Sequence, residues 1–526
     1  MSFQNSSCKT FRLFCNEEQE PDPEPIENIK INFFSSNQLQ HPKNNFNRAL
    51  CLSGGGARSF TMSITILRDL ELNNKINNFD TIGSVSGGSW ANALFQYGKY
   101  DSRSEFLGDV YEPQNINQEN INLLPKTCVR SCTDISIGDE LIREAGAVIN
   151  FLLEKEKFST IWKRLVSYYS VPFSLNVNKF FSYNEESIKK ELENQSELSR
   201  EDFILPSKIL PFPLFFSTIE GPESLEPYII GTNMRATIFE MSPLYTGIYN
   251  PLSITYTNEE KTKEDTIDVG NFINSVSFKG ILVENNISKV NERFLLLDAM
   301  SLSSWALGSF INSLELPDFL DKELYIENYF NKTENNEFLF TDGGTVNNEG
   351  IIPMVQRNFE TIVCCVNSDT KFNYFISDDY TIETLPLDFR LASLFGINLT
   401  QNFFGERTYD FTNAQIFKKE NFYTLIKEMN NIEKKGDGIV CKIEVETIEN
   451  NWYNIPGNRK HILIIIYPSV PENWFNLLKP EIQSIVEEKN LPFIKTQLVG
   501  INAESSNLMA SMTSWTVNKY MDVIME

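Results

Sequence analysis

Two successive segments of the chain share the order strand, glycine turn, helix, and this repetition constrains the fold more than any other feature. In segment 48–72, an apolar strand is broken by Gly54-Gly-Gly56 and is followed by apolar residues at helical spacing. In segment 79–97, a second apolar strand meets Ser86-Gly-Gly88, and another helical pattern follows. Two such units in a row predict an α/β fold with a central, mostly parallel sheet flanked by helices. Functional groups are then expected at the carboxyl ends of the strands.

The remaining sequence predicts one main domain with an extension and an insertion. Residues 1–45 contain a Pro-rich acidic stretch and read as an N-terminal extension, so the main domain is expected over 46–526. Between about 101 and 205 the periodicity weakens, which is typical of a cap or lid inserted after two core units. Further strands are predicted at 361–366 and at His461–Tyr467.

Composition excludes several classes of function. The chain has 46 Lys and Arg against 70 Asp and Glu, and its net charge of −24 has the wrong sign for attraction to nucleic acid or to an anionic membrane. The apolar stretch His461–Tyr467 is far shorter than the ~20 residues of a membrane-spanning helix. No secretory signal is apparent at the N-terminus. The cysteines form no CxxC pair and several lie in predicted core strands, so we expect free thiols and a cytoplasmic protein.

Ser86 is a candidate nucleophile. A serine on a sharp strand-to-helix turn points its hydroxyl out of the sheet, and small neighbours are required because the turn brings backbone atoms together. The residue two positions before the nucleophile is usually glycine, and here it is Ser84. A structural turn with a serine N-cap is the alternative.

The loop Gly54-Gly-Gly56 can place backbone N–H groups around one anionic atom at a helix N-terminus. It lacks the Gly-Lys-Ser/Thr of a P-loop and the spacing of a dinucleotide site, so a phosphate group or the oxyanion of an acyl-transfer intermediate is the better fit. Arg58 follows in the first helical turn, where a cation opposes the helix dipole. A phosphate-bearing ligand explains this arginine, and so does a structural ion pair.

Asp342 begins the sequence Asp342-Gly-Gly344, which by itself is most often a turn. The chain has only two histidines, His41 and His461, and neither lies at a glycine turn or at the carboxyl end of a predicted strand. If Ser86 is a nucleophile, an aspartate must therefore act as its base.

These motifs together resemble the catalytic domain of the cytosolic (group IV) phospholipases A₂ and the lysophospholipases, within the patatin-like superfamily. The resemblance rests on the order of GGGAR, SVSGGSW and DGG, on Asn348 and Pro353 after them, and on weaker matches between 211 and 310. It extends from Leu52 to about Asp369 and fades beyond.

The resemblance implies a Ser-Asp dyad, with Ser86 as the nucleophile and Asp342 as the base. It also implies that amides of the loop Gly54, Gly55 and Gly56 bind the oxyanion and that Arg58 contacts the substrate phosphate. The expected reaction is hydrolysis of fatty-acyl esters of phospholipids or lysophospholipids through an acyl-serine intermediate, without metal or cofactor. The expected partners are the lipid substrate and a peripheral membrane surface, with no nucleic acid. Some family members carry a calcium-dependent membrane-docking β-sandwich, and 45 preceding residues are too few to form one.

Two other functions are compatible with the same sequence. A lipid acyltransferase would form the same acyl-enzyme and pass the chain to an alcohol other than water. A non-catalytic lipid-binding scaffold is disfavoured because the nucleophile, the base and the glycine loop are all intact. Head group, acyl position and oligomeric state are not encoded in any motif that we identify.

Overall fold

The fold was obtained as a computed structural model of the 526-residue chain. It describes residues 33–36, 39, 46–99, 106–122, 158–167, 175–195, 198–208, 210–222, 236–257, 264–273, 279–284, 287–292, 294–305, 325–331, 334–373, 385–399, 414–495 and 501–526.

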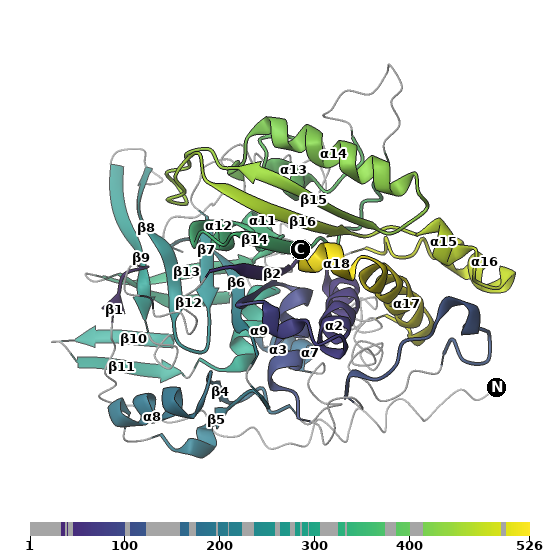
Figure 1. The fold of residues 1–526 in the computed structure, drawn as a ribbon. Helices are drawn as coiled ribbons and strands as arrows, with labels where there is room; N and C mark the ends of the chain where they lie inside the picture. The colour runs from purple at the N-terminus through teal and green to yellow at the C-terminus, as the bar shows by residue number, and fades with distance from the viewer. Residues whose placement is uncertain are drawn as a thin grey trace, which may run out of the picture.

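A single large sheet organises this part of the chain (Figure 1). Its five central strands are parallel, in the order β6-β3-β2-β14-β16, and antiparallel strands extend it at both edges. The predicted fold class, an α/β protein with a central parallel sheet and flanking helices, is confirmed. The strands of this sheet are β1 (Phe33–Phe34), β2 (Arg48–Leu52), β3 (Thr81–Val85), β6 (Phe212–Pro222), β7 (Thr237–Met241), β8 (Thr246–Thr257), β9 (Glu264–Ile273), β12 (Tyr325–Asn331), β13 (Glu334–Asp342), β14 (Thr361–Cys365), β15 (Ile439–Glu446) and β16 (Lys460–Tyr467).

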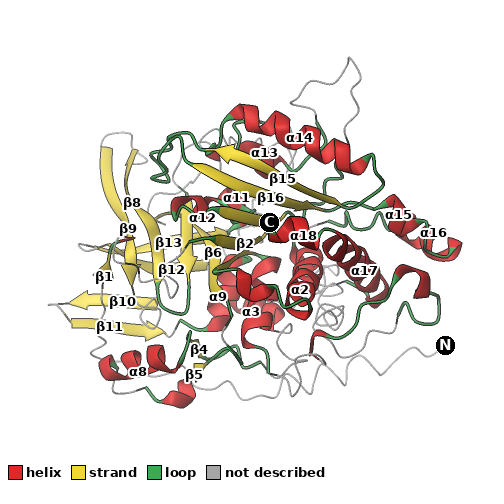
Figure 2. Cartoon of the chain, in the orientation of Figure 1, coloured by secondary structure: helices red, strands yellow, loops and turns green. Residues whose placement is uncertain are grey.

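Helices cover both faces of the parallel strands, and antiparallel strands such as β8 and β9 lie to the left in Figure 2. Four short strands lie outside the large sheet and pair as β4 with β5 and β10 with β11. These are β4 (Phe180–Phe181), β5 (Phe203–Ile204), β10 (Lys279–Glu284) and β11 (Ile287–Glu292). The helices are α2 (Gly56–Leu72), α3 (Gly87–Tyr97), α7 (Phe158–Ser167), α8 (Glu185–Asn194), α9 (Leu296–Ser303), α11 (Gly344–Asn347), α12 (Ile352–Gln356), α13 (Phe389–Ser393), α14 (Lys419–Glu433), α15 (Glu472–Phe475), α16 (Pro480–Glu488), α17 (Ala503–Lys519) and α18 (Met521–Met525), with 3₁₀ turns at Ile76–Asn78, Pro113–Asn115 and Arg200–Asp202.

The core is divided by the sheet into two layers, because successive side chains of a strand point to opposite faces. Leu50 and Leu52 of β2 pack with α2, α3, α9 and α17 on one face. Ala49 and Cys51 of the same strand pack with α12, α13 and α14 on the other. A strand covered on both faces must be apolar at every position, which is why the sequence of β2 shows no alternation.

Part of the predicted insertion at about 101–205 packs against the main body in the structure. The indole of Trp162, on α7, lies 5.9 Å from that of Trp305 and donates to the main-chain oxygen of Ser301 at 3.2 Å. Residues 101–105, 123–157 and 168–174 of this segment lie outside the described part of the chain. The cap therefore stays a prediction.

Among the described residues, no helix combines the length and the apolar character that crossing a bilayer requires. Cysteines 51, 364, 365 and 441 are free and buried.

Candidate active site

Ser86 lies on a sharp turn between β3 and α3. Its backbone has φ 52° and ψ −125°, a region that residues with a side chain rarely adopt. The turn is held by the main-chain N–H of Ser86, which donates to the carbonyl oxygen of Ser303 at 3.1 Å and to its Oγ at 3.0 Å. The sequence predicts this sharp turn for a nucleophile whose hydroxyl points out of the sheet. Ser86 is nevertheless largely buried, with 6% of its surface exposed.

The two glycines after Ser86 permit the close approach of two helix N-termini. A Cβ on Gly87 would lie 2.0 Å from the carbonyl oxygen of Gly56, and a Cβ on Gly88 would lie 2.6 Å from that of Leu52. No side chain fits at these distances. The serine turn and the glycine loop are therefore in direct backbone contact.

Strand β6 sets the distance between Ser86 and Asp342. Along one edge of β6, β3 runs parallel and ends with Val85 opposite Phe216, while β13 arrives antiparallel and ends with Asp342 opposite Ser217. Val85 and Asp342 are thus paired with consecutive residues of β6, and Ser86 follows Val85 directly in the chain. Because one residue of a strand spans about 3.3 Å, a single-residue slip of either neighbour would separate them.

Two hydrogen bonds anchor the main chain of Asp342, and its buried surroundings change the pKa of its carboxyl. Its N–H donates to the carbonyl oxygen of Trp305 at 3.2 Å, and its carbonyl accepts from Thr218 Oγ1 at 3.0 Å. Burial raises the pKa of the carboxyl to about 6. The amide of Gly344, which donates to Oδ1 at 2.7 Å, a hydrogen bond from Ser86 and the charge of Arg390 all lower the pKa and partly offset the burial.

This environment suits a general base. A carboxylate with an ordinary pKa near 3.8 holds a proton weakly, whereas one with a pKa of about 6 is ionised at neutral pH and still basic enough to accept the serine proton. The structure brings Ser86 and Asp342 together within hydrogen-bonding contact.

The glycine loop lies directly beside Ser86. A Cβ on Gly54 would lie 3.1 Å from Ser86 Cβ and 2.4 Å from Asn348 Oδ1. Gly55 and Gly56 have φ values of 140° and 57°, which favour glycine. Within the described part of the chain, neither of their N–H groups has an acceptor. Both are available to an oxyanion.

The amide of Gly54 is already engaged, because it donates to the main-chain oxygen of Asn348 at 3.1 Å. Gly54 therefore ties the loop to the end of α11. Of the three glycines that the sequence predicts as oxyanion donors, Gly55 and Gly56 remain candidates.

Arg58 is buried behind this loop, with 2% of its surface exposed. Its Nε and Nη2 donate to the carbonyl oxygen of Asn367 at 3.0 and 2.8 Å, and its Nη1 donates to that of Ile494. Through these contacts the guanidinium, which lies beside Gly55, ties the start of α2 to the segments that contain Asn367 and Ile494. The predicted contact with a substrate phosphate stays untested, and the geometry favours the structural alternative.

Two residues that the sequence did not single out as functional complete the site. Ser303, at the end of α9, accepts the N–H groups of Ser86 and Gly343 and donates to the carbonyl of Phe216 at 2.7 Å. Asn348 contacts Gly54 and places its Oδ1 beside Gly344. Asn348 is one of the residues that carry the resemblance, but its contact with Gly54 has no sequence signal, and neither has the role of Ser303, because each acts through segments that only the fold brings together.

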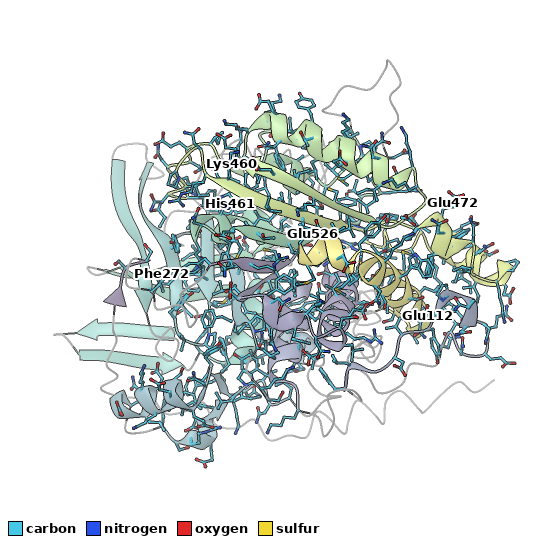
Figure 3. All side chains as sticks on the ribbon, in the orientation of Figure 1. Glu112, Phe272, Lys460, His461, Glu472 and Glu526 are labelled. Atoms are coloured by element: carbon cyan, nitrogen blue, oxygen red, sulfur yellow. The ribbon has the colours of Figure 1, made fainter. Side chains whose placement is uncertain are left out.

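His461 takes no part in this site. It lies near the start of β16, at the end of the parallel sheet opposite to Ser86, beside Lys460 in Figure 3. Its Nδ1 is 2.6 Å from the carbonyl oxygen of Phe359, and burial lowers its pKa. His41 lies outside the described residues.

The chain is similar to solved structures but matches no family model or curated sequence. No protein-family model matches the chain, and no curated protein sequence matches it. Among solved structures, it is similar to human GIVD cytosolic phospholipase A2, with 12% identity and a TM-score of 0.43 over 91% of this chain and 59% of that one. The same human protein in complex with methyl gamma-linolenyl fluorophosphonate gives 12% identity and a TM-score of 0.38 over 93% and 60%. The chain thus spans about 60% of the length of these structures. Because the identity and the TM-scores are low, the function proposed below rests on the site geometry and on the sequence motifs.

Proposed function

We propose that this chain is a serine lipid acyl hydrolase that cleaves fatty-acyl esters of phospholipids or lysophospholipids. The observation that carries the proposal is the hydrogen-bonding contact of Ser86 with Asp342, at the point where β3 and β13 end next to each other along β6. Two glycine amides without an acceptor among the described residues lie beside them. The motifs that resemble the cytosolic phospholipases A₂ supply the lipid substrate class. A peripheral membrane surface is then the expected source of substrate, and the cytoplasm is the expected location.

In the proposed reaction, Ser86 Oγ attacks the ester carbonyl carbon while Asp342 accepts the hydroxyl proton. The N–H groups of Gly55 and Gly56 stabilise the negative oxygen of the tetrahedral intermediate, an effect worth ~3 to 4 kcal/mol for a single donor. The C–O bond to the leaving alcohol then breaks, and Asp342 returns the proton to that oxygen. Water repeats the sequence on the acyl-serine, with Asp342 again as the base, and releases the fatty acid.

A serine-directed fluorophosphonate followed by peptide mapping tests the nucleophile. We expect a single adduct on Ser86, absent from Ser86→Ala. Ser84→Ala and Ser89→Ala are matched controls, because both hydroxyls lie within a few residues but are fully buried and hydrogen-bonded. An adduct on Ser84 or Ser89 in the wild-type chain would contradict the assignment, and absence of any adduct would favour the non-catalytic scaffold.

Hydrolysis and acyl transfer are distinguished by product analysis. Phospholipid vesicles with and without an added acceptor alcohol are incubated with the wild-type chain. We expect free fatty acid as the main product in both cases. Quantitative transfer of the acyl chain to the acceptor would instead assign the chain as an acyltransferase with the same dyad.

A further inference from the structure

A second carboxyl group lies immediately behind the site, and the reaction described above does not use it. Glu349 follows Asn348 in the segment between α11 and α12, and its side chain is completely buried. Among the described residues, neither of its carboxyl oxygens has a partner at hydrogen-bonding geometry. The side chain of Asn348 is nevertheless close enough to lower the pKa of this carboxyl. A buried carboxylate without a firm partner is strongly disfavoured, so the group is expected to hold a proton.

The main chain around Glu349 is fixed by two thiols. Cys364 Sγ, on β14, lies 3.4 Å from the carbonyl oxygen of Glu349, and Cys51 Sγ, on β2, lies 3.4 Å from that of Gly350. Burial raises the pKa of both thiols well above the ordinary value, so both stay neutral. The carboxyl therefore cannot escape to solvent by a small shift of its own backbone.

The charged groups around Glu349 act in opposite directions. Asp388, at the N-terminus of α13, raises the pKa of the Glu349 carboxyl, and Arg390 on the same helix lowers it. Burial is the largest influence, and together these bring the pKa to about 8. The group therefore changes charge within a range of pH in which Asp342 is already ionised.

Asn348 connects this carboxyl to the active site. Its main-chain oxygen accepts the Gly54 amide at 3.1 Å, and its Oδ1 is packed against both Gly54 and Gly344. Because the Asn348 side chain already interacts with this carboxyl, a negative charge on Glu349 would draw it closer, and such a shift would disturb the contacts that hold the glycine loop beside Ser86.

We propose that Glu349 is a proton-binding positioning residue that regulates the active site. With a neutral carboxyl, Asn348 stays packed against the glycine loop; when the proton is lost to solvent base, the loop shifts and acylation of Ser86 slows. This inference rests on the proposed function, since it concerns the regulation of the same site.

The pH dependence of Ser86 labelling tests the regulatory step. Rates of fluorophosphonate labelling are measured from pH 5 to 10 for the wild-type chain and for Glu349→Gln, which cannot ionise. The wild-type rate should rise through about pH 6, where Asp342 ionises, and fall about tenfold through about pH 8. In Glu349→Gln the labelling rate should still rise through about pH 6 but should not decrease through about pH 8. A fall of equal size and midpoint in both proteins would overturn the proposal.

Glu360→Gln is the matched control, because it makes the same substitution at an exposed position just before β14, at the amino end of the parallel strands and away from Ser86. It should follow the wild-type profile throughout. If Glu349→Gln does not fold, Glu349→Met provides a second side chain of similar length that cannot ionise. Its labelling rate is likewise expected not to decrease above about pH 8.

The stability of the chain gives a readout that does not depend on catalysis. Because the folded-state pKa of Glu349 lies above its unfolded value, its favourable contribution is complete below about pH 4.5 and is lost as the pH rises through about 8. The free energy of unfolding in urea should therefore decline over this interval in the wild-type chain relative to Glu349→Gln. If the difference in free energy of unfolding between the two proteins did not change with pH, the inference would be overturned. If the stability difference changed as expected but Ser86 were not labelled, only the proposed function would be overturned.

Discussion

The main-chain N–H of Ser86 donates to both oxygens of Ser303, the carbonyl at 3.1 Å and Oγ at 3.0 Å. The candidate nucleophile Ser86 is thus held by the end of α9, a helix more than 200 residues away in the sequence. Since this N–H is occupied, it does not serve as an oxyanion donor. The arrangement fixes the unusual backbone conformation of Ser86 and leaves only its hydroxyl free to react.

The first prediction concerns the backbone strain at Ser86. Glycine adopts the observed φ of 52° freely, whereas alanine does not. Ser86→Gly should therefore be more stable than Ser86→Ala by about 1 to 3 kcal/mol in urea unfolding, although both are inactive. The same pair of substitutions at Ser84, inside β3, should show the reverse order, because glycine weakens a regular strand. Equal stability of the two Ser86 variants would mean that the turn is not strained.

The second prediction concerns the base. Asp342→Asn should lower the rate of ester hydrolysis by about 10² to 10⁴ fold, because it removes the carboxylate that hydrogen-bonds the Ser86 hydroxyl and accepts its proton. In the wild-type chain the rate should rise with pH through about 6, since the active form is the carboxylate. Retention of more than about a tenth of the rate in Asp342→Asn would exclude this role.

The same substitution should stabilise the chain. Burial raises the pKa of Asp342 from 3.8 to about 6, so the ionised carboxyl opposes folding at pH 8. At about 1.4 kcal/mol per pKa unit, Asp342→Asn should increase the free energy of unfolding by roughly 2 to 3 kcal/mol at pH 8. The gain should diminish as the pH falls through about 6 toward 3.8, and the carboxyl is protonated in both states only below that range. Asp522→Asn, a matched control on the C-terminal helix α18, should change the stability little at either pH.

The third prediction tests the glycine loop. An added methyl on Gly54 would lie 2.4 Å from Asn348 Oδ1 and 3.1 Å from Ser86 Cβ. Gly54→Ala should therefore displace the loop and reduce the labelling rate of Ser86 about 10² fold, comparable to the loss of one oxyanion donor. Gly436→Ala is the comparison. Gly436 has a φ of 73°, which favours glycine, and it follows α14, away from Ser86. It should cost about 1 kcal/mol of stability and leave labelling unchanged.

The fourth prediction concerns Arg58. Its guanidinium is buried and donates to the carbonyl oxygens of Asn367 and Ile494. Arg58→Ala leaves these oxygens without their donors and should cost on the order of 3 kcal/mol of stability. Activity on a phospholipid and on a neutral ester of the same chain length should fall together. A selective loss on the phospholipid, at an unchanged melting temperature, would restore the phosphate contact that the sequence predicts.

The parallel core was predictable from local patterns, because each strand and helix there has its own signal. The predicted strand 79–85 and the following helix correspond to β3 and α3, and the predicted strand 361–366 corresponds to β14. The sequence of residues 367–458 is rich in Asn, Phe and Glu and has no clear helical or strand periodicity, yet its described part contains α13, α14 and β15. Strand β15 lies at the edge of the sheet with partly exposed polar residues, so its hydrophobic signal is weaker. The polar sequence of residues 261–268 is typical of a loop, but residues 264–268 belong to β9, whose pairing with β8 outweighs its poor strand propensity.

The candidate site was only partly predictable. Ser86 and Asp342 each stand beside glycines that a turn requires, so their local sequences identify them. The roles of Asn348, Ser303 and Glu349 depend on contacts between distant segments, and the burial of Arg58 depends on the chain near Ile494. No single stretch of sequence contains that information.

The meeting of β3 and β13 along β6 also has a consequence for how the chain acquires activity during folding. The units that carry the nucleophile and the glycine loop are contiguous in sequence, whereas β13 joins β6 only after a chain segment of more than 100 residues has closed. An intermediate with the parallel strands formed and β13 undocked would possess the nucleophile without its base. Such a species would lack the proton acceptor for Ser86, so the proposed activity requires the pairing of β13 with β6 as well as the parallel core.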